Sequence, residues 1–162
     1  MKNLKIRVST DPVMVGTVSK LGAKPTVVAY SELYTALQAG VVDGAEQPIA
    51  NYKANSFNEV APYLVLDGHT MGIFELVISD TAWEKLSSNQ RSWIQEAAAY
   101  ASQKCRKASE SRESSTLEAL KKAGVTVVKV TNKQTWRNAV QDVILSNLRG
   151  LDETYNSILA MK

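Results

Sequence analysis

The sequence is poor in the residues that carry metal and nucleophile chemistry. It contains one histidine, His69, and one cysteine, Cys105, among 162 residues. A standard zinc site takes several cysteine or histidine ligands, so the composition excludes one. No G-x-S-x-G, Walker or G-x-G-x-x-G motif occurs either. We therefore expect neither an enzyme nor a bound cofactor.

Long apolar runs and an excess of one charge are also missing. No apolar run approaches the roughly 20 residues that a membrane-spanning helix needs. The formal net charge is +3, and the basic clusters Lys104–Lys107 and Lys121–Lys122 alternate with glutamates, which is typical of a solvated helix face and excludes a nucleic-acid partner. A single cysteine excludes an internal disulfide, and the position of Cys105 on a helical apolar stripe predicts a buried thiol.

The first third of the chain alternates strand and helix patterns. Strands are predicted at Leu4–Val8, Thr26–Tyr30 and Val41–Ala45 from β-rich, alternating residues. A helix capped by Asp11 and ended by Gly22 separates the first two, and a helix capped by Ser31 and stopped by Gly40 separates the next two. Strands joined by helices of this length predict an α/β fold with a parallel sheet.

The rest of the chain is dominated by one long helical pattern. It begins at Ser87, which forms a capping box with Gln90, and ends at Gly124, about 50 Å away at 1.5 Å per residue. Its apolar face fades over Ser109–Thr116, which predicts a strut between two lobes. Further strands are predicted at Tyr63–Leu66, Met71–Ser79 and Val125–Val130, and two further helices begin at a second capping box, Thr131 with Gln134, and at Leu151.

Polar residues follow the third predicted strand. Glu46 and Gln47 lie at the carboxyl end of a parallel strand, where open α/β sheets bind ligands. The amide of Gln47 can both donate to and accept from a polar ligand. The alternative for Gln47 is a helix cap or a loop residue before Pro48.

Four further residues have two interpretations each. Arg7 either alternates outward with Lys5 or aims its guanidinium into a cleft to bind a carboxylate. Tyr30 and Phe74 either line a cleft or belong to the core. His69, between Gly68 and Thr70, is either a solvated loop residue or a site residue.

The chain resembles the solute-binding proteins of tripartite ATP-independent periplasmic (TRAP) transporters, the DctP family. The segments that carry the resemblance are, in chain order, KIRV, LGAKPT, AYSELYTALQAGVVDGAEQP, FNEVAPYL, HTMGIFELVISDTAWEKLSSNQRSWIQEAA and KKAGVTVVKV. They span most of the chain, and the ELYTALQ-G-VDG-E core is the most specific of them.

The resemblance implies a two-lobed periplasmic α/β protein that closes on a small organic or sugar acid, such as a dicarboxylate. The protein would deliver the acid to the membrane permease subunits of its transporter. Arg7 would form the salt bridge with the ligand carboxylate. Gln47 stands where the family commonly has asparagine, Tyr30 replaces a frequent phenylalanine, and His69 lies where relatives carry a histidine near the cleft.

Members of the family carry a further N-terminal region with much of the first lobe. We therefore expect this chain to be a partial or truncated protein, with residues 1–79 as the second-lobe core, 80–124 as connecting and lobe-spanning helices, and 125–162 as a returning strand and C-terminal helices. Apolar edges left without their packing partners favour dimerisation or segment exchange. The alternative to an acid-binding module is a structural, oligomerising α/β domain that binds no solute.

Overall fold

The computed structural model describes residues 1–161, and the chain divides into two compact units. The first unit comprises Met1–Asp67 together with the chain from Gly124 onward. The second unit is Gly68–Ala123. The division into 1–79, 80–124 and 125–162 stays a prediction.

The first unit is built on a three-stranded parallel sheet, as predicted. Its strands are β1 (Lys5–Val8), β2 (Lys24–Val27) and β3 (Gly44–Ala45), in the order β2-β1-β3. Arg7 on the central strand is in register with Thr26 on β2 and with Ala45 on β3. Strand β3 is shorter than predicted, because the N–H groups of Val41 and Val42 bond to the Ala36 carbonyl at the preceding helix end, 2.9 and 3.3 Å away.

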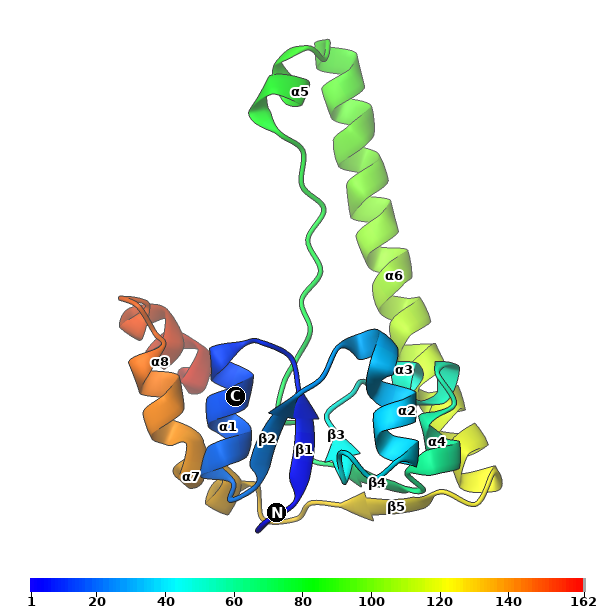
Figure 1. Ribbon diagram of the computed structural model, residues 1–162. Helices are drawn as coiled ribbons and strands as arrows, with labels where there is room; N and C mark the ends of the chain where they lie inside the picture. The colour runs from blue at the N-terminus through cyan, green and yellow to red at the C-terminus, as the bar shows by residue number, and fades with distance from the viewer. Residues whose placement is uncertain (162) are drawn as a thin grey trace. The chain divides into compact units, whose positions relative to one another are not determined.

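The two crossovers of this sheet lie on opposite faces. Helix α1 (Pro12–Lys20) leads from β1 to β2, and η1 (Tyr30–Glu32) with α2 (Leu33–Gln38) leads from β2 to β3. Because β2 and β3 flank β1 on opposite sides, right-handed crossovers place α1 and α2 on opposite faces, as Figure 1 shows. The Asp11 cap and the Gly40 stop are confirmed, whereas Ser31 is wrong as a cap because Tyr30–Glu32 winds into a 3-10 turn before α2.

Alternation along β1 separates an apolar face from a polar one. Val8 is fully buried in a cluster with Val18 and Ala23 of the α1 side, and Ile6 packs against that cluster. Arg7 points to the other face, yet only 6% of it is exposed. The outward interpretation of Arg7 is therefore wrong, because backbone and aromatic groups that follow β2 lie against it.

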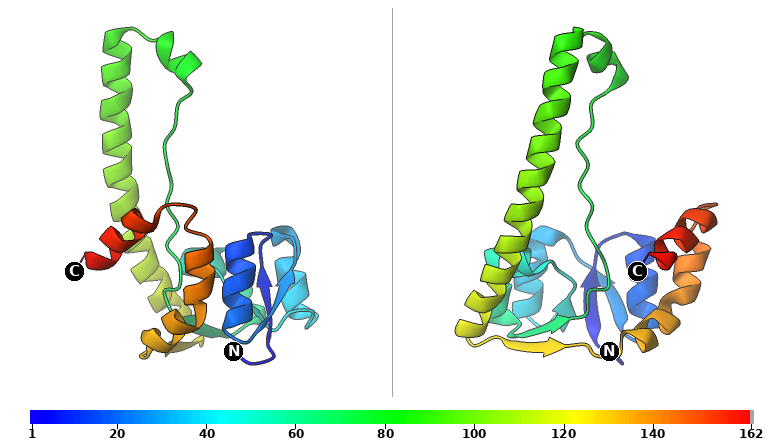
Figure 2. Two further views of the ribbon diagram at one scale, coloured as in Figure 1. Left: turned by 90° about the vertical axis from the view of Figure 1, so that its left-hand side faces the viewer. Right: turned by 180° about the vertical axis from the view of Figure 1, so that it is seen from behind.

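The first unit also contains helices and strands outside this sheet and its crossovers. They are α3 (Ile49–Ala54), α4 (Phe57–Val60), β4 (Tyr63–Leu66), β5 (Thr126–Lys129), α7 (Lys133–Ser146) and α8 (Asp152–Ala160). Strands β4 and β5 form a separate parallel pair, which confirms both predicted strands. Helix α7 lies beside α1 in both views of Figure 2. Its cap is Asn132, which accepts from the Thr135 N–H, so the predicted capping box at Thr131 is wrong.

The second unit consists of α5 (Asp80–Glu84) and α6 (Ser88–Lys122) after an irregular segment. Helix α6 has 35 residues and begins with the predicted capping box of Ser87 and Gln90. Cys105 is exposed rather than buried, because within this unit the described residues place no element over its stripe of α6. The role of α6 as a strut between lobes stays a prediction.

The predicted strand at Met71–Ser79 is wrong. Those residues have no regular secondary structure, and Met71, Phe74 and Val77 are 83%, 95% and 85% exposed. A β pattern becomes a strand only where another strand completes its hydrogen bonds. Among residues 1–161 no strand pairs with this segment.

Candidate functional site

The carboxyl ends of the three parallel strands meet at one edge of the first unit's sheet. The chain leaves β1 at Val8, β2 at Val27 and β3 at Ala45. Because the connections depart to opposite faces, the β1–β3 boundary is a topological switch point, where open α/β sheets bind ligands. Four of the five predicted site residues belong to these strands or follow them within three residues.

Arg7 is the buried cation at this edge. Its Nε donates to the Val28 carbonyl, 2.9 Å away, one residue beyond the end of β2. Its Cζ lies 5.7 Å from the centroid of the Tyr30 ring, which is within cation–π range. The hydrogen bond to Val28 and the contact with the Tyr30 ring orient the Arg7 guanidinium.

Tyr30 belongs to neither the strand nor the core. It opens η1, and 43% of it is exposed. The ring meets Phe57 edge to face, with centroids 6.1 Å apart and planes at 81°. Its hydroxyl oxygen accepts a hydrogen bond of 2.9 Å from Nδ2 of Asn55. The ring is thus held on one side by Arg7 and on another by Phe57, with its hydroxyl bound to Asn55.

Glu46 and Gln47 directly follow β3 and are half-buried. The cap of α3 is Pro48 and not Gln47, so the helix-cap interpretation of Gln47 is wrong. Gln47 lies in the loop, two residues after Ala45, which is the register partner of Arg7. The sheet therefore brings Arg7, Tyr30, Glu46 and Gln47 to a single edge.

His69 and Phe74 belong to the second unit, where both are exposed. The Phe74 side chain is 95% exposed, so within this unit it is not a core residue. The role of His69 as a polar selector stays a prediction.

A pocket of about 450 Å³ opens beside Tyr30. It is lined by Tyr30, Ser31, Tyr34, Ala54, Asn55, Ser56, Phe57 and Glu59. The Tyr34 hydroxyl donates to Oε2 of Glu59 at 3.2 Å, and desolvation, with a smaller effect of Glu59, raises the pKa of Tyr34. Sequence reasoning missed Asn55, Tyr34 and Glu59, because α3 and α4 bring them to Tyr30 only in the folded chain.

Metal binding has no support in this geometry. Residues 1–161 contain no cluster of three or more histidine, cysteine, aspartate or glutamate side chains that could hold an ion. In the same residues, no helix is both long and apolar enough to cross a membrane. What the first unit offers is a buried cation beside an open aromatic and polar surface.

Comparison with known proteins identifies the family. Residues 1–149 match the DctP family, described as bacterial extracellular solute-binding protein, family 7. The chain belongs to this family. Family 7 members are solute-binding proteins rather than enzymes, and the predicted fold class is confirmed.

Among individual relatives, a solute-binding protein of Roseobacter denitrificans is 34% identical over 91% of this chain, which covers 45% of that protein. Among solved structures, a TRAP periplasmic solute-binding protein of Xanthobacter autotrophicus with bound β-D-galacturonate is 28% identical, with a TM-score of 0.88. A counterpart from Polaromonas bound to D-erythronate is 32% identical, with a TM-score of 0.86. Each alignment covers 99% of this chain and 54% of the solved one.

The chain thus spans about half the length of the family 7 relatives that it matches. This agrees with the expectation, drawn from the sequence, of a partial protein. The half that is present includes the strand edge with Arg7, Tyr30 and Gln47.

Proposed function

We propose that this chain binds a small hydroxylated carboxylic acid, of the sugar-acid class, in the periplasm. It passes the acid to the permease subunits of a TRAP transporter. In this proposal Arg7 holds the ligand carboxylate, Gln47 and His69 select polar groups, Glu46 borders the site, and Tyr30 forms a wall of the cleft. Hinge motion around the long helix α6 closes the site.

The observation that carries the proposal is the burial of Arg7 at the switch point. Burying a guanidinium costs desolvation free energy, so a buried arginine in a sheet indicates a function for its charge. Its planar fork matches both oxygens of a carboxylate, which a lysine cannot reproduce. The contact with Val28 pre-orients the group, so less side-chain entropy is lost when an acid binds.

The relatives support the ligand class. The Xanthobacter and Polaromonas proteins hold galacturonate and erythronate, each a monocarboxylate with several hydroxyl groups. A site for such ligands needs one cation and several neutral donors and acceptors. Arg7 supplies the cation, and Gln47 and the Tyr30 hydroxyl supply neutral polar groups at the same edge.

The test is a titration of the chain with D-galacturonate and D-erythronate, followed by backbone NMR shifts, with D-galactose as the ligand that lacks a carboxylate. We expect saturable shifts with the acids alone. Arg7→Ala and Arg7→Lys remove charge-assisted hydrogen bonds worth about 1.5–3 kcal/mol, so acid binding falls at least about tenfold.

The matched control is Lys5→Ala. Lys5 lies two residues earlier on the same face of β1, is cationic, and bonds to the Gly40 carbonyl at 2.6 Å. Its removal changes the net charge as Arg7→Ala does and leaves acid binding intact. Equal losses in the two variants, or undiminished binding by Arg7→Ala, contradict the role of Arg7.

The rival function is an oligomerising domain that binds no solute. The exposed apolar residues between Met71 and Ile78 favour it, because such segments associate. Light scattering on the titrated samples separates the two functions. A stable dimer that shows no shift with either acid supports the rival.

A further inference from the structure

We propose that Asn55 is a positioning residue of the acid site. Its side-chain amide donates a hydrogen bond to the Tyr30 hydroxyl oxygen. The hydroxyl proton of Tyr30 is then left to donate to the bound acid. This inference rests on the proposed function, because it assigns a role at the same site. It adds the C-cap residue of α3, which neither the strand edge nor the family motifs contain.

The direction of the Asn55–Tyr30 hydrogen bond follows from a third group. Nδ2 of Asn55 lies 2.9 Å from the Asn51 carbonyl oxygen and 2.9 Å from the Tyr30 hydroxyl oxygen. A backbone carbonyl can only accept, so the amide face turned toward Asn51 and Tyr30 must be the NH₂ group. A flipped amide would set its own oxygen against the Asn51 carbonyl. The Tyr30 oxygen is therefore the acceptor.

The consequence concerns the proton of the Tyr30 hydroxyl. A phenol has a single O–H, and when its oxygen accepts from Asn55 that proton is directed elsewhere. The hydroxyl then presents a donor to an oxygen of the acid. Without Asn55, the proton can turn toward the vacated side and to water.

The ring geometry keeps this donor in place. Phe57 meets the Tyr30 ring edge to face, and the Arg7 guanidinium lies within 5.7 Å of the ring centroid. Arg7, Tyr30 and Asn55 therefore form a chain of contacts from the carboxylate anchor to the pocket wall. Since Asn55 and Tyr30 are both exposed, water competes with the bond, and we expect a modest effect on affinity.

The experiment is a double-mutant cycle on the chain with D-galacturonate as the probe, using Tyr30→Phe, Asn55→Ala and the double variant. Tyr30→Phe is expected to weaken binding about two- to tenfold, the range of one neutral hydrogen bond. Asn55→Ala is expected to weaken it by a similar factor in the parent. In the Tyr30→Phe background, Asn55→Ala changes binding less than about 1.5-fold, because no hydroxyl remains to be oriented.

A merely structural role of Asn55 predicts the same loss in both backgrounds, and that result overturns the inference. So does an Asn55→Ala variant that binds as the parent does. Asn51→Ala is the control, since it is the same substitution one helical turn earlier and keeps the carbonyl that Asn55 uses. The side-chain amide NMR signal of Asn55 gives a readout without ligand, and it shifts in Tyr30→Phe if the bond exists.

The cycle also separates this inference from the function that it rests on. If the parent binds no D-galacturonate, or binds it independently of Arg7, the proposed function fails and the role of Asn55 fails with it. If the parent binds through Arg7 but the cycle is additive, only the role of Asn55 is lost.

Discussion

At the scale of single residues, Tyr52 shows how a polar group is held inside the first unit. The residue is 6% exposed, and its hydroxyl donates to the Ala61 carbonyl. Tyr52→Phe leaves that carbonyl without its partner, so we expect the free energy of unfolding to fall by about 1 kcal/mol in urea titrations. Tyr63→Phe, on an exposed tyrosine of β4, is the control and should leave stability unchanged.

The pH dependence of the same pair of variants has a defined sign. Burial raises the pKa of Tyr52 above its ordinary value of 10.0, so the folded chain holds this proton more tightly than the unfolded chain. The contribution to stability is complete below pH 10 and is lost as pH rises through the folded pKa. The parent should therefore lose stability more steeply above pH 10 than Tyr52→Phe. Parallel curves for the two contradict this account.

At the scale of elements, the contact between α1 and α7 depends on the absence of a side chain. A Cβ added at Gly16 would lie 3.1 Å from Cγ1 of Val143, so the two helices already touch there. Gly16→Leu is expected to destabilise the chain by about 1–3 kcal/mol through overpacking. Ser19→Leu, on the exposed side of the same helix, should change thermal and urea unfolding by less than about 0.5 kcal/mol.

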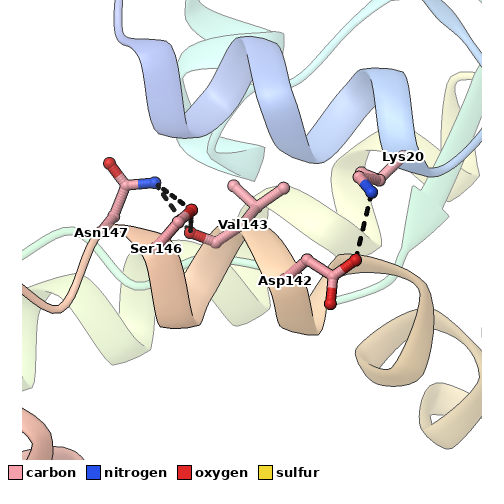
Figure 3. A network of polar contacts seen from close by, with 5 residues as sticks. All are labelled: Lys20, Asp142, Val143, Ser146 and Asn147. Atoms are coloured by element: carbon pink, nitrogen blue, oxygen red, sulfur yellow. Dashed lines mark hydrogen bonds and ion pairs between the residues drawn. The ribbon is translucent and has the colours of Figure 1, made fainter.

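The polar contacts around this interface are secondary to its packing (Figure 3). Lys20 and Asp142 form an ion pair of 3.2 Å, but their side chains are 49% and 81% exposed, and exposed pairs contribute little. Asn147 and Ser146 both bond to the Val143 carbonyl and complete the end of α7.

If packing dominates this interface, Val143→Ala should restore much of the free energy of unfolding that Gly16→Leu loses. Failure to restore it contradicts a packing origin.

At the scale of the whole molecule, the second unit contains a long segment without regular secondary structure before α5. The chain has two phenylalanines, which makes a direct comparison possible. Phe74 is 95% exposed in irregular backbone, whereas Phe57 is 3% exposed at the start of α4. Brief chymotrypsin digestion followed by mass spectrometry should give cleavage after Phe74 well before cleavage after Phe57. Equal cleavage rates contradict the exposure of Phe74, whereas protection of Phe74 that increases with protein concentration indicates that association covers the segment.

The sequence by itself determined the local features, because these depend on neighbours a few residues apart. The Asp11 cap, the box of Ser87 with Gln90, and the left-handed glycines that end helices were all predictable from one helical turn of sequence. The strand pattern also placed Arg7 within the first strand and Glu46 and Gln47 at the carboxyl end of the third, and the parallel pairing of β1 with β3 brings these residues together.

Tertiary structure decided which residues are buried and which strands pair, because both depend on the elements that pack against a residue. Periodicity left Arg7 open between solvent and cleft, and groups that follow β2 bury it. The β pattern of Met71–Ser79 has no partner strand among the described residues, so its alternation produces no strand. Asn55 carries no sequence signal at all, since its part in the site comes from the end of α3 meeting a ring 25 positions away. The burial of a side chain and the residues that it contacts are properties of the assembled fold, and a strand or helix pattern in the sequence specifies neither.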